Sequence, residues 1–270
     1  MKKTIIALLA LSGVAGAFTD TVWNFENTTA TSSGVSNDGA FKPSGTATYV
    51  ETGLTLGTEF GNYSLNADLG YAIDLTSSQW TTTAGSAYWG DGPGYIRLGR
   101  NGQSFTLITY VKFDSVSGEQ FLFGTGSGNA AGVAFGIDNG KLDLLAKGKA
   151  HHVLTGNYTL SANTWYNLAV SYDQATGVAS FYVNGDSVGS LTGLNAIDCA
   201  DGGGAASAFG SGSSDSLQGE FAGEIAQFQI LSGAKTKAEI LSAANLVPEP
   251  ATATLSLLAL AGLAARRRRR

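Results

Sequence analysis

The sequence predicts an all-β protein, an antiparallel β-sandwich flanked by an N-terminal signal peptide and a C-terminal hydrophobic helix. The 270 residues include 37 glycines and only 14% charged residues, a composition typical of short strands joined by tight turns. Segments of alternating polarity recur about every ten to fifteen residues without helical interludes, which favours a sandwich over a parallel α/β sheet. No repeat with a period of about 20 to 50 residues is present, which disfavours a propeller or a solenoid.

The first 17 residues have the three parts of a secretory signal peptide in the expected order. Lys2 and Lys3 form a positive start, Ile5 to Leu11 form a short apolar segment, and Ala15 to Ala17 fit the small-residue cleavage rule. We therefore expect residues 1–17 to be removed and the remainder to lie outside the cytoplasm.

Two long strands are predicted by an alternation of apolar and polar residues with a period of two. Within Ser104 to Phe113, one face carries Phe105, Leu107, Val111 and Phe113. Within Trp165 to Asp173, one face carries Tyr166, Leu168, Val170 and Tyr172, and the other carries Asn167, Ala169, Ser171 and Asp173. The second pattern predicts a half-buried antiparallel strand.

Two Asn-Gly dipeptides predict tight hairpin turns that need a positive φ. Asn139-Gly140 lies between Val133 to Ile137 and Leu142 to Leu144, and Asn184-Gly185 follows Ala179 to Val183.

The two ends of the sandwich are predicted by further strand patterns. Trp23 to Glu26 form an opening strand, and Glu224 to Leu231 form the last strand, followed by a short helix over Lys235 to Ala244. The Gly- and Ser-rich stretch Asp201 to Ser216 is expected to be a mobile surface loop, because a strand pattern resumes at Gly219. One domain over residues 18–246 follows.

The order of these landmarks resembles the laminin-G-like or concanavalin A-like jelly roll. The opening strand is followed by Gly94 to Leu98 and Ser104 to Leu107, then by Asn163 to Asp173 and Ala179 to Gly185, and finally by Gly223 to Phe228 with Ala238 to Ile240. The resemblance spans residues 20–245, and Trp165 to Gly185 is its most specific part. It implies a jelly-roll sandwich.

The C-terminal 24 residues, 247–270, form a third unit. Val247-Pro248-Glu249-Pro250 precedes an apolar run from Ala251 to Ala265, in which Ala and Leu favour a helix. A helix of 15 residues spans about 22 Å, which is marginal for a bilayer core of about 30 Å. The basic cluster that ends the chain should stay cytoplasmic and leave the body outside. Its members are Arg266, Arg267, Arg268, Arg269 and Arg270.

These three parts resemble the PEP-CTERM sorting signal of exported bacterial proteins. The resemblance implies that a membrane-embedded protease, an exosortase, recognises Pro248-Glu249-Pro250 and releases or transfers the body. A permanent C-terminal membrane anchor is the alternative, and it predicts the same topology.

The charge of the body excludes one class of partner. Between Phe18 and Val247 the chain has 9 basic and 20 acidic residues, a net charge of −11 with His neutral. Nucleic acids are bound mainly through Lys and Arg contacts to phosphates, so a nucleic-acid partner is not expected.

The sequence gives no sign of catalysis. Jelly-roll glycosidases place carboxylates alternately along one strand, but here the nearest pair, Glu220 and Glu224, is separated by Phe-Ala-Gly and suits solvated or turn positions. His151 and His152 would point to opposite faces of a strand, and the Ser elbow of a hydrolase triad is missing. We therefore predict that the protein is not an enzyme.

A ligand could be held by aromatic side chains or by a calcium ion. Aromatic rings stack on the apolar C–H faces of sugars, and one Gly/Thr-rich region expected to form loops contains Trp80, Tyr88, Trp89 and Tyr95. These aromatics could equally pack the core. No cofactor is expected, although Gly-rich loops offer weak calcium candidates at Asp91, Asp198 and Asp201.

The leading hypothesis is an exported, non-catalytic binding or adhesion protein of the bacterial cell envelope or extracellular matrix, with a glycan as its ligand. The glycan follows from the family resemblance alone. The alternative is a structural surface protein without a small ligand, and a glycoside hydrolase is the least favoured interpretation. Cys199, the one cysteine, is expected to be unpaired and buried.

Overall fold

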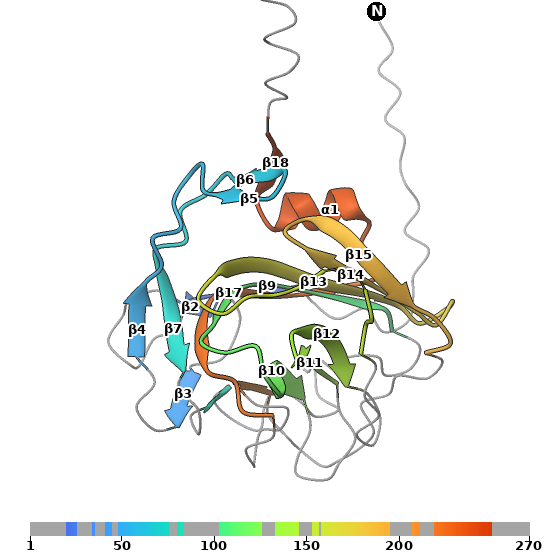
Figure 1. The fold of residues 1–270 in the computed structure, drawn as a ribbon, viewed down its shortest axis with the longest axis horizontal. Coiled ribbons are helices and arrows are strands. Elements are labelled where there is room, and N and C mark those ends of the chain that lie inside the picture. The colour runs from blue at the N-terminus through green and yellow to red at the C-terminus, as the bar shows by residue number, and fades with distance from the viewer. Residues whose placement is uncertain are drawn as a thin grey trace, which may run out of the picture.

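The computed structural model describes residues 20–25, 34–35, 41–44, 48–75, 80–83, 103–125, 133–145, 153–156, 158–194, 207–210 and 219–249. Figure 1 shows three layers: a large curved sheet in the middle, a second sheet below it, and a cap of short strands with one helix above it. All pairs of neighbouring strands are antiparallel, as the sequence predicts.

The middle layer is a nine-stranded sheet. Its main path runs β15 (Asp186–Leu191), β14 (Val178–Val183), β13 (Trp165–Asp173), β9 (Phe105–Phe113), β17 (Gly223–Ser232), β1 (Thr21–Asn24) and β2 (Gly34–Val35). Two further strands, β7 (Tyr71–Leu75) and β4 (Thr48–Glu51), extend from β17 beside β1. The predicted strands at Ser104 to Phe113, Trp165 to Asp173 and Glu224 to Leu231 are confirmed within one residue at each end.

The lower layer is a six-stranded sheet. Its order is β12 (Lys141–Leu145), β11 (Ala134–Asp138), β10 (Glu119–Thr125), β16 (Ser207–Phe209), β8 (Trp80–Thr83) and β3 (Phe41–Ser44). Strand β16 corrects the prediction of a mobile loop over Asp201 to Ser216. Phe209 is fully buried and its ring packs edge-on against Trp23 at 5.5 Å, so this polar segment contributes an aromatic anchor to the core.

Aromatic rings fill the space between the two large sheets. The rings of Phe123 in β10 and Phe228 in β17 stack at 4.8 Å, and Phe209 packs against both at 5.3 Å. The four residues predicted to share a face of β9 all belong to this core, as do Tyr166, Leu168, Val170 and Tyr172 of β13. The sandwich therefore forms around the predicted apolar faces.

The upper layer covers the other face of the nine-stranded sheet and forms a second core. It consists of a small sheet, β18 (Leu246–Pro248), β6 (Tyr63–Leu65) and β5 (Glu59–Phe60), together with the helix α1 (Lys237–Ala243) (Figure 1). The prediction that β13 is half-buried is therefore wrong, because Asn167 and Ala169 on its second face have no exposed surface. Residues 54–69 and the C-terminal segment provide the missing cover.

The chain reversals agree with the sequence. Asn139 and Gly140 join β11 to β12 with φ of 48° and 73°, and Asn184 and Gly185 join β14 to β15 with φ of 51° and 78°. Both turns use the positive φ that Asn and Gly tolerate best.

Helix α1 is short but begins with a complete capping box. The Thr236 hydroxyl accepts a hydrogen bond from the Glu239 N–H, and the Glu239 carboxylate accepts one from the Thr236 N–H at 2.8 Å. The helix is two residues shorter at its start and one at its end than the predicted span, Lys235 to Ala244. Its buried Ile240 belongs to the second core.

One buried tyrosine joins the nine-stranded sheet to the end of α1. Tyr110 of β9 has no exposed surface, and its hydroxyl donates a hydrogen bond to the Ala244 carbonyl at 2.5 Å. Burial raises the pKa of Tyr110 above its ordinary value, so the hydroxyl keeps its proton and remains a donor. Phe60 packs edge-on against the same ring at 5.2 Å.

A surface ion pair joins helix α1 of the upper layer to strand β15 of the nine-stranded sheet. The Lys237 ammonium of α1 lies 2.8 Å from the Asp186 carboxylate of β15, which also accepts hydrogen bonds from the Asn62 amide at 2.9 Å and the Tyr63 hydroxyl at 3.2 Å. The hydrogen bond from Lys237, more than the others, holds the pKa of Asp186 below its usual value. Three separate segments of the chain therefore meet at one carboxylate.

Replacing Tyr110 by phenylalanine should destabilise the protein by about 1–3 kcal/mol, because the buried Ala244 carbonyl loses its donor. Chemical denaturation would measure the loss. Tyr182→Phe is the matched control, since Tyr182 lies in the same core but its hydroxyl makes no hydrogen bond with the described residues. An equal loss in both variants would contradict the role of the hydroxyl.

Replacing Asp186 by asparagine should lower stability by at most about 1 kcal/mol, because the pair is partly exposed and screened by solvent. The lowered pKa of Asp186 means that its contribution is present above the ordinary aspartate pKa of about 3.9 and is lost as the pH falls through the folded-state value. The raised pKa of Lys237 keeps the pair intact to alkaline pH.

The melting temperatures of wild type and Asp186→Asn should therefore differ at pH 6 to 8 and converge in strong acid, in scans at a series of pH values. A difference that persists unchanged at about pH 2 would contradict this assignment.

Candidate ligand-binding site

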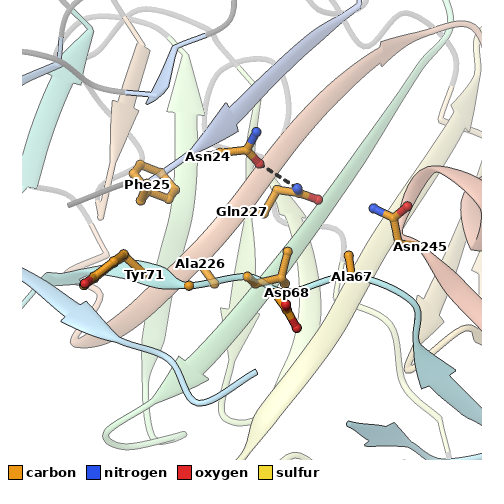
Figure 2. A pocket seen from close by; sticks show the side chains of 10 residues that line it. Asn24, Phe25, Ala67, Asp68, Tyr71, Ala226, Gln227 and Asn245 are labelled. Carbon is orange, nitrogen blue, oxygen red and sulfur yellow. Dashed lines mark hydrogen bonds between the residues drawn. The ribbon is translucent and has the colours of Figure 1, made fainter. Parts of the chain in front are cut away.

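The principal candidate site is a hollow of about 410 Å³ on the capped side of the nine-stranded sheet. It is lined by Asn24, Phe25, Ala67, Asp68, Leu69, Gly70, Tyr71, Ala226, Gln227 and Asn245. Figure 2 shows Tyr71, Ala67 and Asp68 along one chain segment, with Asn24 and Gln227 facing them and Asn245 at one end. We call this space the larger hollow.

The larger hollow lies where two strands share one edge of β17. Strand β7 pairs with β17 through Gly223 to Ile225, and β1 pairs with the same edge from Gln227 onwards. On the opposite edge, the register between β17 and β9 shifts at this point, so that Ala226 is an extra residue in a β-bulge. Bulges are common beside functional sites because they disrupt the ladder and re-aim side chains.

The wall formed by residues 66–71 is fixed by its own backbone hydrogen bonds. The Leu69 N–H donates to the Leu54 carbonyl at 2.9 Å, and the Asn66 N–H donates to the Asn245 carbonyl at 2.7 Å. The Asp68 carboxylate accepts from the Leu56 N–H at 2.7 Å. The segment that holds Asp68 and Tyr71 is therefore attached both to the preceding loop and to the end of α1.

The opposite wall is fixed by a chain of side-chain amides. The Gln227 amide donates to the Asn24 carbonyl oxygen at 2.7 Å (Figure 2). The Gln229 side-chain amide donates to the side-chain oxygen of Gln227 at 2.6 Å and to the backbone carbonyl of Ala243 at 2.8 Å. Because each amide orients the next, Asn24 and Gln227 are held in place before any ligand binds.

Several polar groups of the larger hollow remain available to a ligand. Among the described residues, no hydrogen bond uses the Tyr71 hydroxyl, the Asn245 amide or the second carboxylate oxygen of Asp68. Asn24, Asp68 and Asn245 are exposed, and Tyr71 is half-buried. The site thus combines amide donors, a carboxylate acceptor and an aromatic ring.

A smaller hollow of about 240 Å³ adjoins the larger one. It shares Asp68, Gly70 and Tyr71 with the larger hollow and is otherwise lined by Glu51, Thr52, Gly53, Leu54 and Thr55. The Thr52 hydroxyl donates to the Leu69 carbonyl at 2.9 Å and holds the shared wall.

The aromatic residues predicted from the sequence are not shown to form a site. Trp80 was expected in a loop, but it is the first residue of strand β8, where the Trp80 to Thr83 backbone pairs with β3. Tyr88, Trp89 and Tyr95 lie outside the described residues. Their role in binding stays a prediction.

The calcium candidates lie outside the described residues as well: Asp91, Asp198 and Asp201, together with Cys199 and both histidines. Within the part of the chain that the structure describes, no group of three or more His, Cys, Asp or Glu side chains could hold a metal ion.

The two glutamates considered as catalytic candidates differ in environment. Glu220 is exposed, as expected, but Glu224 is not a solvated or turn residue, because it lies within β17 and pairs with Lys112 at 2.5 Å. Its cross-strand neighbour in β7 is Asp74, whose pKa is raised mainly by burial and further by the Glu224 charge. Glu220, Glu224 and Asp74 are all absent from the lining of the two hollows.

The predicted sorting motif begins within the described fold. Pro248 is the last residue of β18 and pairs with Tyr63, and the Glu249 N–H donates to the Asn62 carbonyl at 3.1 Å. The backbone pairing of β18 with β6 therefore continues past Leu246, the last residue of the predicted domain, into the first residues of the predicted sorting signal. Pro250 and Arg266 to Arg270 lie outside the described residues, and among the helices of the described part none is long and apolar enough to cross a membrane.

The sequence interpretation missed the residues of both hollows. Asn24 and Tyr71 have no motif around them, and the lining of the larger hollow comes from four segments that lie as far apart in the sequence as Asn24 and Asn245. The one available signal was Asn24, which lies in the predicted opening strand on the side opposite the buried Trp23.

Comparison with known protein families identifies the sandwich. Residues 81–241 match the Laminin_G_3 family, described as the concanavalin A-like lectin/glucanases superfamily. No curated protein matches the sequence.

Solved structures share the fold at low sequence identity. Domain 4 of AbnA, an extracellular GH43 arabinanase from Geobacillus stearothermophilus in complex with arabinotriose, has a TM-score of 0.59 and 17% identity, covering 84% of this chain and 98% of its own. Botulinum neurotoxin type C, whose cell entry depends on two ganglioside molecules, has a TM-score of 0.54 and 14% identity, covering 85% and 51%. The binding domain of Paraclostridial Mosquitocidal Protein 1 has a TM-score of 0.53 and 14% identity, covering 83% and 51%.

Proposed function

We propose that this chain, which belongs to the concanavalin A-like lectin/glucanases superfamily, is a non-catalytic protein that binds glycans in the larger hollow. The observation that carries the proposal is the pre-organised lining of that hollow. Amide, carboxylate and tyrosine groups converge there from β1, from the segment between β6 and β7, from β7 and β17, and from Asn245, two residues after the end of α1.

This lining suits the chemistry of a sugar. A sugar presents many hydroxyl groups, which both donate and accept hydrogen bonds, and apolar C–H faces that pack on aromatic rings. Asn24 and Asn245 supply amide donors, Asp68 supplies an acceptor, and the Tyr71 ring supplies an apolar surface. The volume of about 410 Å³ lies within the usual range of ligand pockets, about 300–1,000 Å³.

The structural neighbours support the same ligand class. One is an arabinanase domain in complex with arabinotriose, and another belongs to a toxin that depends on gangliosides. Fold does not fix function, so the proposal depends on the lining of the hollow, and the neighbours add support to it.

The absence of catalysis is part of the proposal. A glycosidase acid needs a raised pKa, which is normally produced by burial, and a second carboxylate that faces it. The carboxylates of the two hollows, Asp68 and Glu51, are both exposed. Incubation of the purified protein with polysaccharides should therefore release no sugar.

Replacing Tyr71 by alanine should weaken glycan binding about two- to twelvefold, because the ring contributes about 0.5–1.5 kcal/mol through stacking. Tyr71→Phe keeps the ring and should retain most of the affinity. A glycan array followed by calorimetry on the full-length protein would measure both, and melting temperatures would check that the variants fold.

If the wild-type protein bound no glycan on the array, glycan binding would be rejected and the alternative, a structural surface protein without a small ligand, would be favoured. Equal affinity of wild type and Tyr71→Ala would place the binding site elsewhere, first at the predicted aromatics Trp80, Tyr88, Trp89 and Tyr95.

We also propose that the protein is exported and sorted to the cell envelope by its two ends. Residues 1–17 direct export, and residues 247–270 form a PEP-CTERM signal that an exosortase recognises. The support is the sequence pattern: a Pro-Glu-Pro motif, an apolar run and five terminal arginines in order.

Replacing Arg266 to Arg270 by neutral residues should abolish retention of the precursor in the membrane, because the arginines stop translocation from the cytoplasmic side. Cell fractionation and immunoblotting would measure the distribution. The conservative replacement of all five by lysine is the control and should preserve retention. Identical fractionation of wild type and the neutral variant would contradict the stop-transfer role.

A further inference from the structure

We propose that the larger and smaller hollows form one extended site for a neutral oligosaccharide of at least two sugar units, with Gly70 at the passage between them. The inference rests on the proposed glycan-binding function and adds the length and the charge of the ligand.

The two hollows share a wall. Asp68, Gly70 and Tyr71 line both spaces, so a ligand that contacts these residues from the larger hollow is already beside the smaller one. The smaller hollow, about 240 Å³, is below the usual size of a ligand pocket, whereas the larger is within that range. The smaller hollow therefore suits a second unit of a ligand whose first unit occupies the larger one.

Gly70 has no side chain to fill the passage between the two hollows. The backbone conformation at this position does not itself require a glycine. Its φ lies outside the left-handed region, and a Cβ added there would meet no other atom within 4 Å. A side chain at this position would therefore be tolerated by the fold and would project into free space. The backbone is held in place, because the Gly70 carbonyl accepts a hydrogen bond from the Thr52 N–H at 3.0 Å.

An exposed apolar residue directly follows the lining of the smaller hollow in the sequence. Leu56 follows the lining residue Thr55 and is 66% exposed, the more exposed of the two large hydrophobic residues that lie at the surface among the described residues. Its N–H is bonded to Asp68, which places this residue next to the shared wall.

The charges of the lining favour a neutral ligand. The described residues that line the two hollows include two carboxylates, Asp68 and Glu51, and no lysine, arginine or histidine. An acidic sugar, such as a uronate or a sialic acid, would place its carboxylate beside these groups with no cation to compensate it. The net charge of −11 between Phe18 and Val247 adds to the repulsion.

Calorimetry on the full-length protein with arabino- and gluco-oligosaccharides of one to four units, and with uronate oligosaccharides of the same lengths, tests the proposal. We expect affinity to rise roughly tenfold from one to two or three neutral units, about 1.4 kcal/mol, and then to level off. Uronate oligosaccharides should bind at least about tenfold more weakly than the neutral series at low salt.

Two variants and one matched control separate the parts of the site. Gly70→Leu should reduce affinity for the neutral trisaccharide roughly tenfold with an unchanged melting temperature, because its side chain fills the passage. Ala175→Leu adds the same side chain at an exposed turn between β13 and β14 and should change nothing. Glu51→Lys places a cation in the smaller hollow alone and should raise affinity for uronate oligosaccharides.

The outcomes are distinguishable. Binding that is equal for one unit and for four, or a trisaccharide affinity unaffected by Gly70→Leu, would overturn the extended site while leaving the proposed function in place. Stronger binding of uronates than of neutral sugars would overturn the neutral specificity. Absence of binding to every glycan would overturn the proposed function and this inference together.

Discussion

The structure depends on a constraint at its centre: the nine-stranded sheet is buried on both faces. One face packs against the six-stranded sheet through stacked aromatic rings, and the other needs a separate cover. Residues 54–69, α1 and β18 provide that cover, and Tyr110 connects it to the sheet through one buried hydrogen bond. The larger hollow lies where this cover ends above Ala226, so the candidate site is a product of how the second core is closed.

The strands and turns of the sandwich could be predicted because the sequence patterns that specify them involve residues close together in the chain. The alternating residues of β9 and β13 and the two Asn-Gly turns define strands and reversals within a few positions of each other. The second core could not be predicted from that pattern. The outward face of β13 contains Asn167 and Ser171, which look like solvent-facing residues but are buried. The Asn167 amide nitrogen donates a hydrogen bond to the Thr109 carbonyl, and the Ser171 hydroxyl donates one to the Lys235 carbonyl.

The lining of the candidate site could not be predicted from local sequence patterns either, because it also depends on contacts between distant segments. Asn24, Tyr71 and Gln227 become neighbours only because β1 and β7 both pair with one edge of β17. Strand β16 is a case in which composition predicted the wrong structure. A stretch rich in Gly and Ser was expected to be a loop, yet its Phe209 is buried among Trp23, Phe123 and Phe228. A single anchoring ring outweighs the composition of the residues around it.

The pairing of β18 with β6 has a consequence for how the molecule would be presented to its surroundings. The strand ends at Pro248, only three positions after Asn245 in the wall of the larger hollow. A surface or partner that binds the polypeptide just past Glu249 would therefore act within a few residues of that wall. Under the proposed sorting and glycan binding, the point of attachment would lie only a few residues along the chain from an asparagine that lines the binding site.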